Sequence, residues 1–66
     1  MEETIKKLAD NMIFVKIQPK RIDGDWAFRY VWERFNANGD SMYMSEWGGF
    51  EEVMDCVNDA LGHVND

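Results

Sequence analysis

The sequence is poor in cysteine, proline and histidine, and it contains no long apolar run. Its 66 residues include one cysteine, one proline and one histidine. A single cysteine excludes an internal disulfide and a zinc site built from several cysteines. The longest apolar run covers residues 12–15, whereas a membrane-spanning helix needs about 20 residues. The first residues are acidic and no apolar segment follows them, unlike a secretory signal, so we expect a reducing, cytoplasmic location.

Basic residues are also scarce, and they are confined to residues 6–34. Seven Lys or Arg stand against thirteen Asp or Glu, which gives a formal net charge of −6. Residues 1–22 hold five basic and three acidic residues (net +2), whereas residues 23–66 hold two basic and ten acidic residues (net −8). No Lys or Arg follows Arg34. This balance argues against a protein that wraps nucleic acid through phosphate contacts.

The first third of the chain predicts a short helix followed by a strand. Residues 2–10 carry apolar side chains at helical spacing. From residue 13 onwards apolar and polar side chains alternate, which predicts a strand that ends at Pro19. The Asp-Gly-Asp sequence at 23–25 then predicts a turn.

The middle of the chain predicts a β-hairpin built around an aromatic strand over residues 26–35. Alternation gives this strand one aromatic face. That face comprises Trp26, Phe28, Tyr30 and Trp32. Asn38-Gly39 is a preferred type I′ turn and predicts a returning strand over 41–47, with Met42 opposite Phe35 and Trp47 opposite Tyr30. We expect the aromatic face, joined by Tyr43 and Trp47, to form the core under the helices.

The end of the chain predicts a longer amphipathic helix. Gly48-Gly49 interrupts the sheet, and an apolar stripe then runs from Phe50 to Val64. The predicted fold is therefore α+β: a three-stranded antiparallel sheet flanked by a short N-terminal helix and a longer C-terminal helix (α-β-β-β-α). A chain of this length has room for one core, so we expect a single domain over residues 1–66, with both helices on one face of the sheet.

The sequence predicts neither catalysis nor a bound cofactor or metal. We expect His63 at the last turn of the final helix, where it interacts with the helix dipole. Cys56 has no basic residue beside it and is expected to be a packing residue. The function is therefore expected to lie in the surface of the domain and not in an active site.

Two sets of side chains are candidate partner-binding residues. Carboxylates can steer and fit a basic nucleic-acid-binding surface, although a merely solvated acidic helix face is the alternative. The acidic candidates are Asp23, Asp25, Asp40, Glu46, Glu51, Glu52, Asp55 and Asp59. The sheet face opposite the predicted core is unusually apolar, which is typical of interaction sites. The apolar and aromatic candidates are Phe35, Met42, Met44, Trp26 and Trp47.

Residues 43–52 (Tyr-Met-Ser-Glu-Trp-Gly-Gly-Phe-Glu-Glu) fall where a third strand passes into a second helix. In this order of elements the chain resembles the double-stranded-RNA-binding domain, which has a similar length. That family grips phosphates with a basic cluster at the start of its second helix, whereas this chain has Phe50-Glu51-Glu52 there. The resemblance implies the fold, and the inverted charge argues against RNA binding in that mode.

Other segments carry a second resemblance. They are Lys6-Lys7, Val15-Lys16-Ile17, residues 36–40 (Asn-Ala-Asn-Gly-Asp) and Ser45-Glu46. With these segments in one layout, the chain resembles small acidic phage anti-CRISPR proteins, which pair a short N-terminal helix with a three-stranded sheet and acidic helices. Some of them occupy the DNA-binding site of an RNA-guided nuclease with carboxylates. The resemblance implies such a role for Asp23, Asp25, Asp40 and Glu46.

We therefore expect a non-enzymatic inhibitor, encoded by a phage or another mobile element, that mimics or competes with nucleic acid and binds a bacterial defence nuclease complex in the host cytoplasm. Its partner would be a CRISPR effector or similar protein with a basic nucleic-acid-binding surface, and neither nucleic acid nor a membrane would be bound directly. One alternative is a small dimeric scaffold that uses the apolar sheet face, its acidity serving only solubility. Another is nucleic-acid binding by base stacking on Trp26 or Trp32, near the basic residues at 16, 20 and 21.

Overall fold

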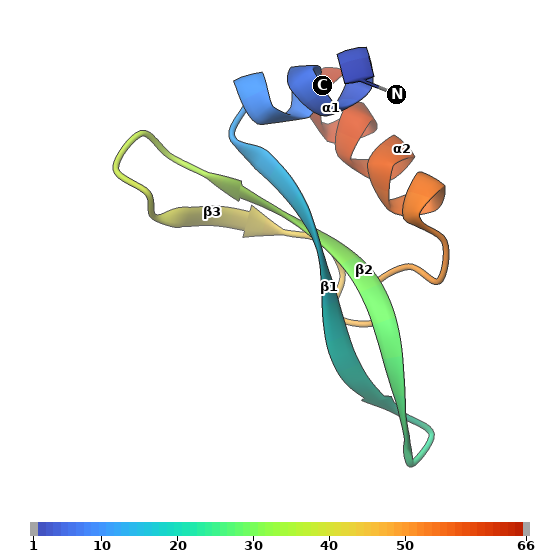
Figure 1. Cartoon of the computed structure of the whole chain (residues 1–66). Coiled ribbons are helices and arrows are strands. Elements are labelled where there is room, and N and C mark those ends of the chain that lie inside the picture. Colours follow the sequence, from blue (N-terminus) through green and yellow to red (C-terminus); the bar gives the residue numbers. More distant parts are fainter. Residues whose placement is uncertain (1, 66) are drawn as a thin grey trace.

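Both helices of the chain lie on one face of a three-stranded antiparallel sheet (Figure 1). The computed structural model describes residues 2–65 of the chain, and the side chains of residues 2–64. The elements are α1 (Glu2–Asp10), β1 (Ile13–Ile22), β2 (Asp25–Phe35), β3 (Ser41–Met44) and α2 (Val53–Asn65). Strand β2 lies between β1 and β3. The predicted α-β-β-β-α order and α+β class are confirmed.

Helix α1 is short and docks on the sheet through Leu8, which is buried. Glu2 and Glu3 occupy its first turn, where the helix dipole favours negative charge. At its end the side-chain amide of Asn11 donates to the carbonyl oxygen of Lys7 at 2.9 Å. Met12 then adopts a left-handed backbone conformation with φ of 61°, and this residue turns the chain into β1.

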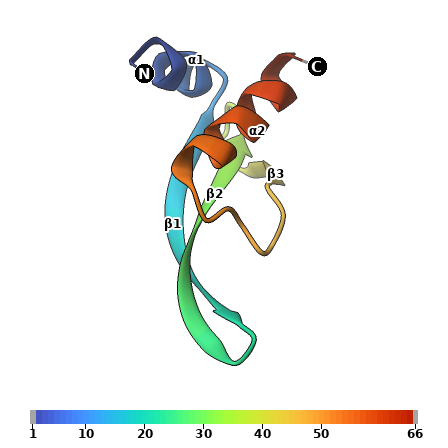
Figure 2. The same ribbon diagram turned by 90° about the vertical axis from the view of Figure 1, so that its right-hand side faces the viewer.

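Strands β1 and β2 form a hairpin that is longer than the helices that cover it. They pair from Ile13 opposite Arg34 to Ile22 opposite Asp25. A strand of ten residues spans about 33 Å, whereas a helix of 13 residues spans about 20 Å. The distal part of the hairpin, residues 19–28, therefore projects beyond α2, as Figures 1 and 2 show. We call residues 19–28 the arm.

The prediction that β1 ends at Pro19 is wrong, because the strand continues to Ile22. Pro19 lies opposite Phe28 in the ladder. A proline has no N–H to donate, but on an edge strand its nitrogen can face solvent without loss of a ladder hydrogen bond. Because β1 is an edge strand, it accommodates Pro19 in its interior.

The core lies between the helices and the central part of β2. Its buried members come from α1, β1, β2 and α2. They are Leu8, Ile13, Trp32, Cys56, Val57 and Ala60. Cys56 is fully buried, which confirms its prediction as a packing residue. Tyr30 and Phe50 are partly buried and pack against this cluster.

The prediction that the whole aromatic face packs under the helices is wrong. Trp32 is 1% exposed, but Trp26 and Phe28 are 68% and 75% exposed. Both lie on the arm, beyond the reach of α2, so the helices do not cover them. Tyr43 and Trp47 are also exposed. Since Trp32 is buried, it offers no free face on which a nucleic-acid base could stack.

The loop between β2 and β3 is longer than the predicted two-residue turn. The side-chain oxygen of Asn36 accepts hydrogen bonds from the backbone N–H of Asn38 at 2.9 Å and of Asp40 at 3.0 Å. This side chain closes a loop over residues 36–40. Phe35 consequently pairs with Ser41 and not with the predicted partner Met42, and β3 ends at Met44 instead of continuing to residue 47.

Helix α2 begins three residues later than predicted, because Phe50 belongs to the sheet. The backbone N–H of Tyr30 donates to the carbonyl oxygen of Phe50 at 2.9 Å, and the backbone N–H of Phe50 donates to the carbonyl oxygen of Tyr30 at 2.8 Å. Phe50 thus takes the position opposite Tyr30 that was predicted for Trp47. Gly49 precedes it with φ of 66°, in the left-handed region.

Candidate interaction surface

Acidic side chains lie along the start of α2 and the loop before it. These side chains are all exposed, and the last three of them follow one another at intervals of three and four residues, which places those three on one side of the helix start. They are Glu51, Glu52, Asp55 and Asp59, and we call these four the acidic band. Carboxylates near a helix N-terminus are stabilised by the helix dipole, so the fold tolerates this concentration of negative charge.

Two members of the acidic band have partners within the fold. The indole N–H of Trp32 donates to Oδ2 of Asp59 at 2.8 Å. Nη1 of Arg29 lies 3.0 Å from Oε1 of Glu51. The side chains of Glu52 and Asp55 have no partner within the described residues 2–64, so these two carboxylates are available to another molecule.

The other predicted acidic candidates lie elsewhere in the fold. Asp23 and Asp25 are at the tip of the arm, and Asp40 is in the β2–β3 loop at the opposite end of β2 (Figure 1). Glu46 follows β3, in the loop that leads towards α2. The eight predicted carboxylates are all exposed, but the fold does not bring them together into one surface.

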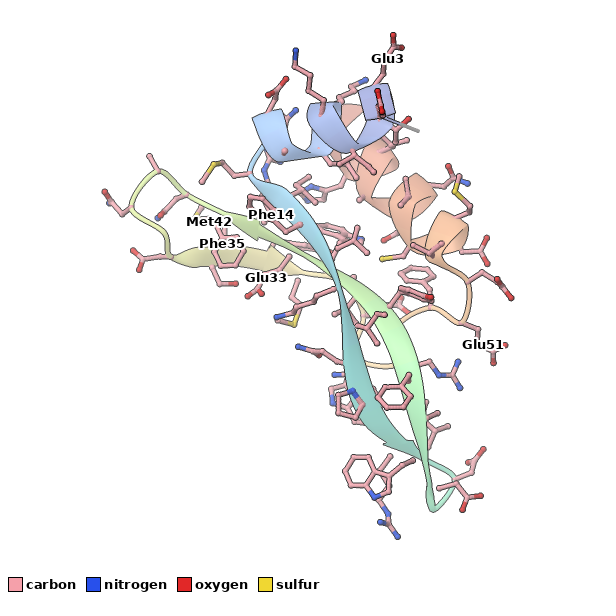
Figure 3. All side chains as sticks on the ribbon, in the orientation of Figure 1. Glu3, Phe14, Glu33, Phe35, Met42 and Glu51 are labelled. Carbon is pink, nitrogen blue, oxygen red and sulfur yellow. The ribbon has the colours of Figure 1, made fainter. Side chains whose placement is uncertain are left out.

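The sheet face turned away from the helices carries an apolar patch next to the β2–β3 loop. Its members come from all three strands. They are Phe14, Phe35, Met42 and Met44, and we call them the open-face patch. The ring centroids of Phe14 and Phe35 are 6.0 Å apart, and Figure 3 shows Met42 beside them. Phe35, beside Phe14, and Met44, opposite Glu33, thus lie on the face opposite the core, whereas Met42 lies at the register shift between β2 and β3.

An ion pair crosses the same face beside the open-face patch. Nζ of Lys16 lies 2.8 Å from Oε1 of Glu33. Hydrogen bonds from Lys16 and from Ser41 hold the pKa of Glu33 below its ordinary value. Glu33 therefore stays ionised at neutral pH, and the open face carries charges of both signs.

Basic side chains of the arm stack on two exposed tryptophans. Nζ of Lys20 lies 5.0 Å from the ring centroid of Trp47. The guanidinium carbon of Arg21 lies 5.8 Å from the ring centroid of Trp26. These distances fit cation–π contacts. Neither pair was predicted from the sequence, although Arg21 opposite Trp26 follows from the register of the β1–β2 hairpin.

His63 belongs to an aromatic cluster as well as to the last turn of α2. Its ring centroid lies 4.6 Å from that of Tyr43 and 5.0 Å from that of Trp32. Nη1 of Arg34 lies 3.4 Å from its Nδ1. We predicted only a helix-dipole role for His63. Its ring contacts could not be predicted from the sequence, because they depend on how close Tyr43 of β3 lies to the end of α2.

Cys56 provides a test of the packing beneath α2. Burial, and to a smaller extent the charge of Asp59, raises the pKa of the Cys56 thiol to about 11. Since the thiolate is the nucleophile, we expect a disulfide reagent at about pH 8 to label the native protein about a hundredfold more slowly than the guanidinium-unfolded protein. Equal rates would contradict the buried position of Cys56.

Among residues 2–64, no group of three or more His, Cys, Asp or Glu side chains has a geometry that could hold a metal ion. Neither α1 nor α2 is long and apolar enough to cross a membrane. Comparison with protein-family models, with curated proteins and with solved structures finds no match for this chain.

Proposed function

We propose that the protein is a non-enzymatic inhibitor that presents its acidic band to the basic, nucleic-acid-binding surface of a partner protein. The observation that carries this proposal is the pair of exposed carboxylates, Glu52 and Asp55, that have no side-chain partner within residues 2–64. Such carboxylates lose no internal contact when they bind cations of another molecule. An excess of one charge sign also accelerates association with a surface of the opposite sign.

The spacing of the acidic band supports competition with nucleic acid. Residues four apart in a helix, such as Asp55 and Asp59, differ in height by about 6 Å. A DNA strand carries one negative charge per rise of about 3.4 Å, so helical carboxylates four apart match roughly every second phosphate. A nucleic-acid-binding nuclease complex of bacterial defence is the kind of partner that we propose. Inhibition by occupancy of its binding groove requires no catalytic group.

Charge reversal of the acidic band is expected to abolish partner binding. In the variant Glu52→Lys/Asp55→Lys, the net charge rises from −6 to −2 and the band presents cations to a basic surface. The matched control is Glu2→Lys/Glu3→Lys, which makes the same change of net charge in the first turn of α1. Both variants lose the same kind of helix-dipole interaction, about 0.3–1 kcal/mol per residue, so their stabilities should be similar.

The measurement is capture of proteins from a bacterial lysate on each immobilised variant, followed by elution with heparin and identification by mass spectrometry. We expect the wild type and the α1 control to retain the same basic nucleoprotein complex, released by heparin and by raised salt because both screen or replace the carboxylates. The band variant should lose at least about 90% of it, a loss of about 1.4 kcal/mol in binding. Equal retention by the band variant, or no effect of heparin, would contradict the proposal.

A further inference from the structure

A groove lies between the second half of α2 and β3. It has a volume of about 380 Å³, which is within the range of small-ligand sites. Among the described residues, no Cα atom of α2 lies within 8 Å of one in β3, so only side chains bridge these two elements. We call this space the α2–β3 groove. It is lined by Trp32, Tyr43, Asn58, Asp59, Gly62 and His63.

Three aromatic rings in mutual contact form one side of the α2–β3 groove. Trp32 is buried and stacks on Tyr43, with an angle of 19° between the two rings. The His63 ring contacts both of them. Tyr43 itself is 52% exposed, so part of its side chain remains open to another molecule. An accessible aromatic ring attracts cations, and arginine stacks on such rings more often than lysine does.

A carboxylate is held in place beside these rings. Oδ2 of Asp59 accepts the indole N–H of Trp32 at 2.8 Å, which restricts the orientation of the carboxylate. Within residues 2–64, the second oxygen of Asp59, Oδ1, has no donor. The side chain of Asn58 also has no partner in this part of the chain. The groove therefore offers two side-chain acceptors next to an exposed aromatic ring.

A glycine in α2 keeps the α2–β3 groove open. Gly62 lies in the helix, one turn after Asn58, where glycine is a poor helix former. Nothing within the described residues requires glycine at this position, since its φ is not positive and a Cβ would meet no atom within 4 Å. A longer side chain at position 62 would point back over the preceding turn and fill the groove. Gly62 thus preserves space that the domain itself does not use.

The charges around the α2–β3 groove favour a cation. Asp55 lies one helical turn before Asp59 and adds a second negative charge on the same side of α2. One cation lies close by, because Nη1 of Arg34 is 3.4 Å from Nδ1 of His63. Arg34 lines a neighbouring hollow and not the groove itself. Two carboxylates against one guanidinium leave a net negative charge, which disfavours a phosphate or a carboxylate as the ligand.

We propose that the α2–β3 groove binds the guanidinium group of an arginine side chain of the basic partner protein, an inference that rests on the proposed function. The planar group stacks on the exposed part of Tyr43 and donates to Oδ1 of Asp59 and to the side-chain oxygen of Asn58. A lysine ammonium is a compact and more strongly hydrated charge, so it fits these partners less well. The groove thereby fixes the position of one partner arginine, whereas the rest of the acidic band attracts the basic surface as a whole.

Titration with N-acetyl-arginine methylamide, followed by NMR, tests the groove without any partner protein. The reporter is the indole N–H resonance of Trp32, because this group is bonded to Asp59. The indole resonances of Trp26 and Trp47, which do not line the groove, serve as internal references. We expect a saturable shift of the Trp32 resonance, with a dissociation constant on the order of 10 mM. N-acetyl-lysine methylamide should bind at least about threefold more weakly.

Two variants and their matched controls test the residues of the groove. Asp59→Asn keeps an acceptor for the Trp32 indole but removes the charge, and should weaken the arginine probe at least about fivefold. Asp10→Asn makes the same change at an exposed carboxylate of α1 and should stay within about twofold. Gly62→Leu should weaken the probe at least about fivefold while it raises the melting temperature. Gly62→Ala should also raise the melting temperature but leave the probe within about twofold.

Each outcome either supports or overturns the proposal. A Trp32 resonance that does not approach saturation at about 100 mM probe overturns it, and so does unchanged binding by Gly62→Leu. Equal binding of the arginine and lysine probes overturns the assignment to a guanidinium. Capture from the lysate tests the proposed function separately. Probe binding without capture contradicts that function but supports an arginine site, whereas capture that Gly62→Leu leaves unchanged contradicts the groove as an anchor for the partner.

Discussion

Replacement of Trp32 by alanine is expected to lower the free energy of unfolding by about 3–5 kcal/mol. Trp32 is 1% exposed, stacks on Tyr43 with ring centroids 5.3 Å apart, and donates its indole N–H to Asp59. Truncation of a buried tryptophan to alanine costs about 3–5 kcal/mol. A domain of 66 residues has a total stability of about 3–10 kcal/mol. The loss is therefore comparable to the whole free energy of unfolding at the lower end of that range.

Trp26→Ala is the matched control, because it makes the same substitution in the same strand. Trp26 is 68% exposed and contacts Arg21 across the hairpin, so we expect a loss of less than about 1 kcal/mol. Denaturant titration followed by far-UV circular dichroism measures both variants. A loss at Trp26 as large as that at Trp32 would show that the arm packs against the body of the domain, contrary to the fold described above.

Gly49→Ala is the second change with a large expected effect, about 2–4 kcal/mol of destabilisation. A Cβ on Gly49 would lie 2.8 Å from Cβ of Arg29 and 2.9 Å from the backbone oxygen of Tyr30. Neither atom belongs to the flexible end of a side chain, so the overlap can be relieved only by moving the loop away from β2. That movement would stretch the hydrogen bonds between Tyr30 and Phe50. The positive φ of Gly49 adds strain of its own.

Gly48→Ala provides the control at the neighbouring position. A Cβ there would meet nothing within 4 Å, so we expect a change within about 0.5 kcal/mol. Since 1 kcal/mol shifts the melting temperature of a domain this size by about 4–8 °C, Gly49→Ala should lower it by about 10 °C or more. Thermal melts of the two variants measure the difference. Similar melting temperatures would show that the loop does not pack against β2 as described.

The order and type of the elements could be predicted because each is encoded locally. The helical spacing over residues 2–10 and the alternation from residue 13 onwards depend on neighbouring residues alone, and both elements are present. The same holds for the face of α2 that contains Val57 and Ala60, which are buried. The exposed state of Asp55, off that face, follows from the same helical spacing.

How far the helices cover the sheet, and how β3 pairs with β2, could not be predicted because both depend on parts of the chain that are distant in sequence. Alternation places Trp26 and Phe28 on the same side as Trp32, but it does not say how far α2 extends along that side. The pairing of β3 was mispredicted because a single acceptor, Oδ1 of Asn36, closes a longer loop than Asn38-Gly39 alone would form. The partner of Asp59 was missed for a similar reason, because Trp32 reaches it across the core.

The interior position of Pro19 also governs how the sheet can grow. A strand added along the outer edge of β1 would find no N–H at Pro19 and would meet the cationic side chains at 16, 20 and 21. Open-ended stacking of copies edge to edge, the route to fibres, is therefore disfavoured at this strand.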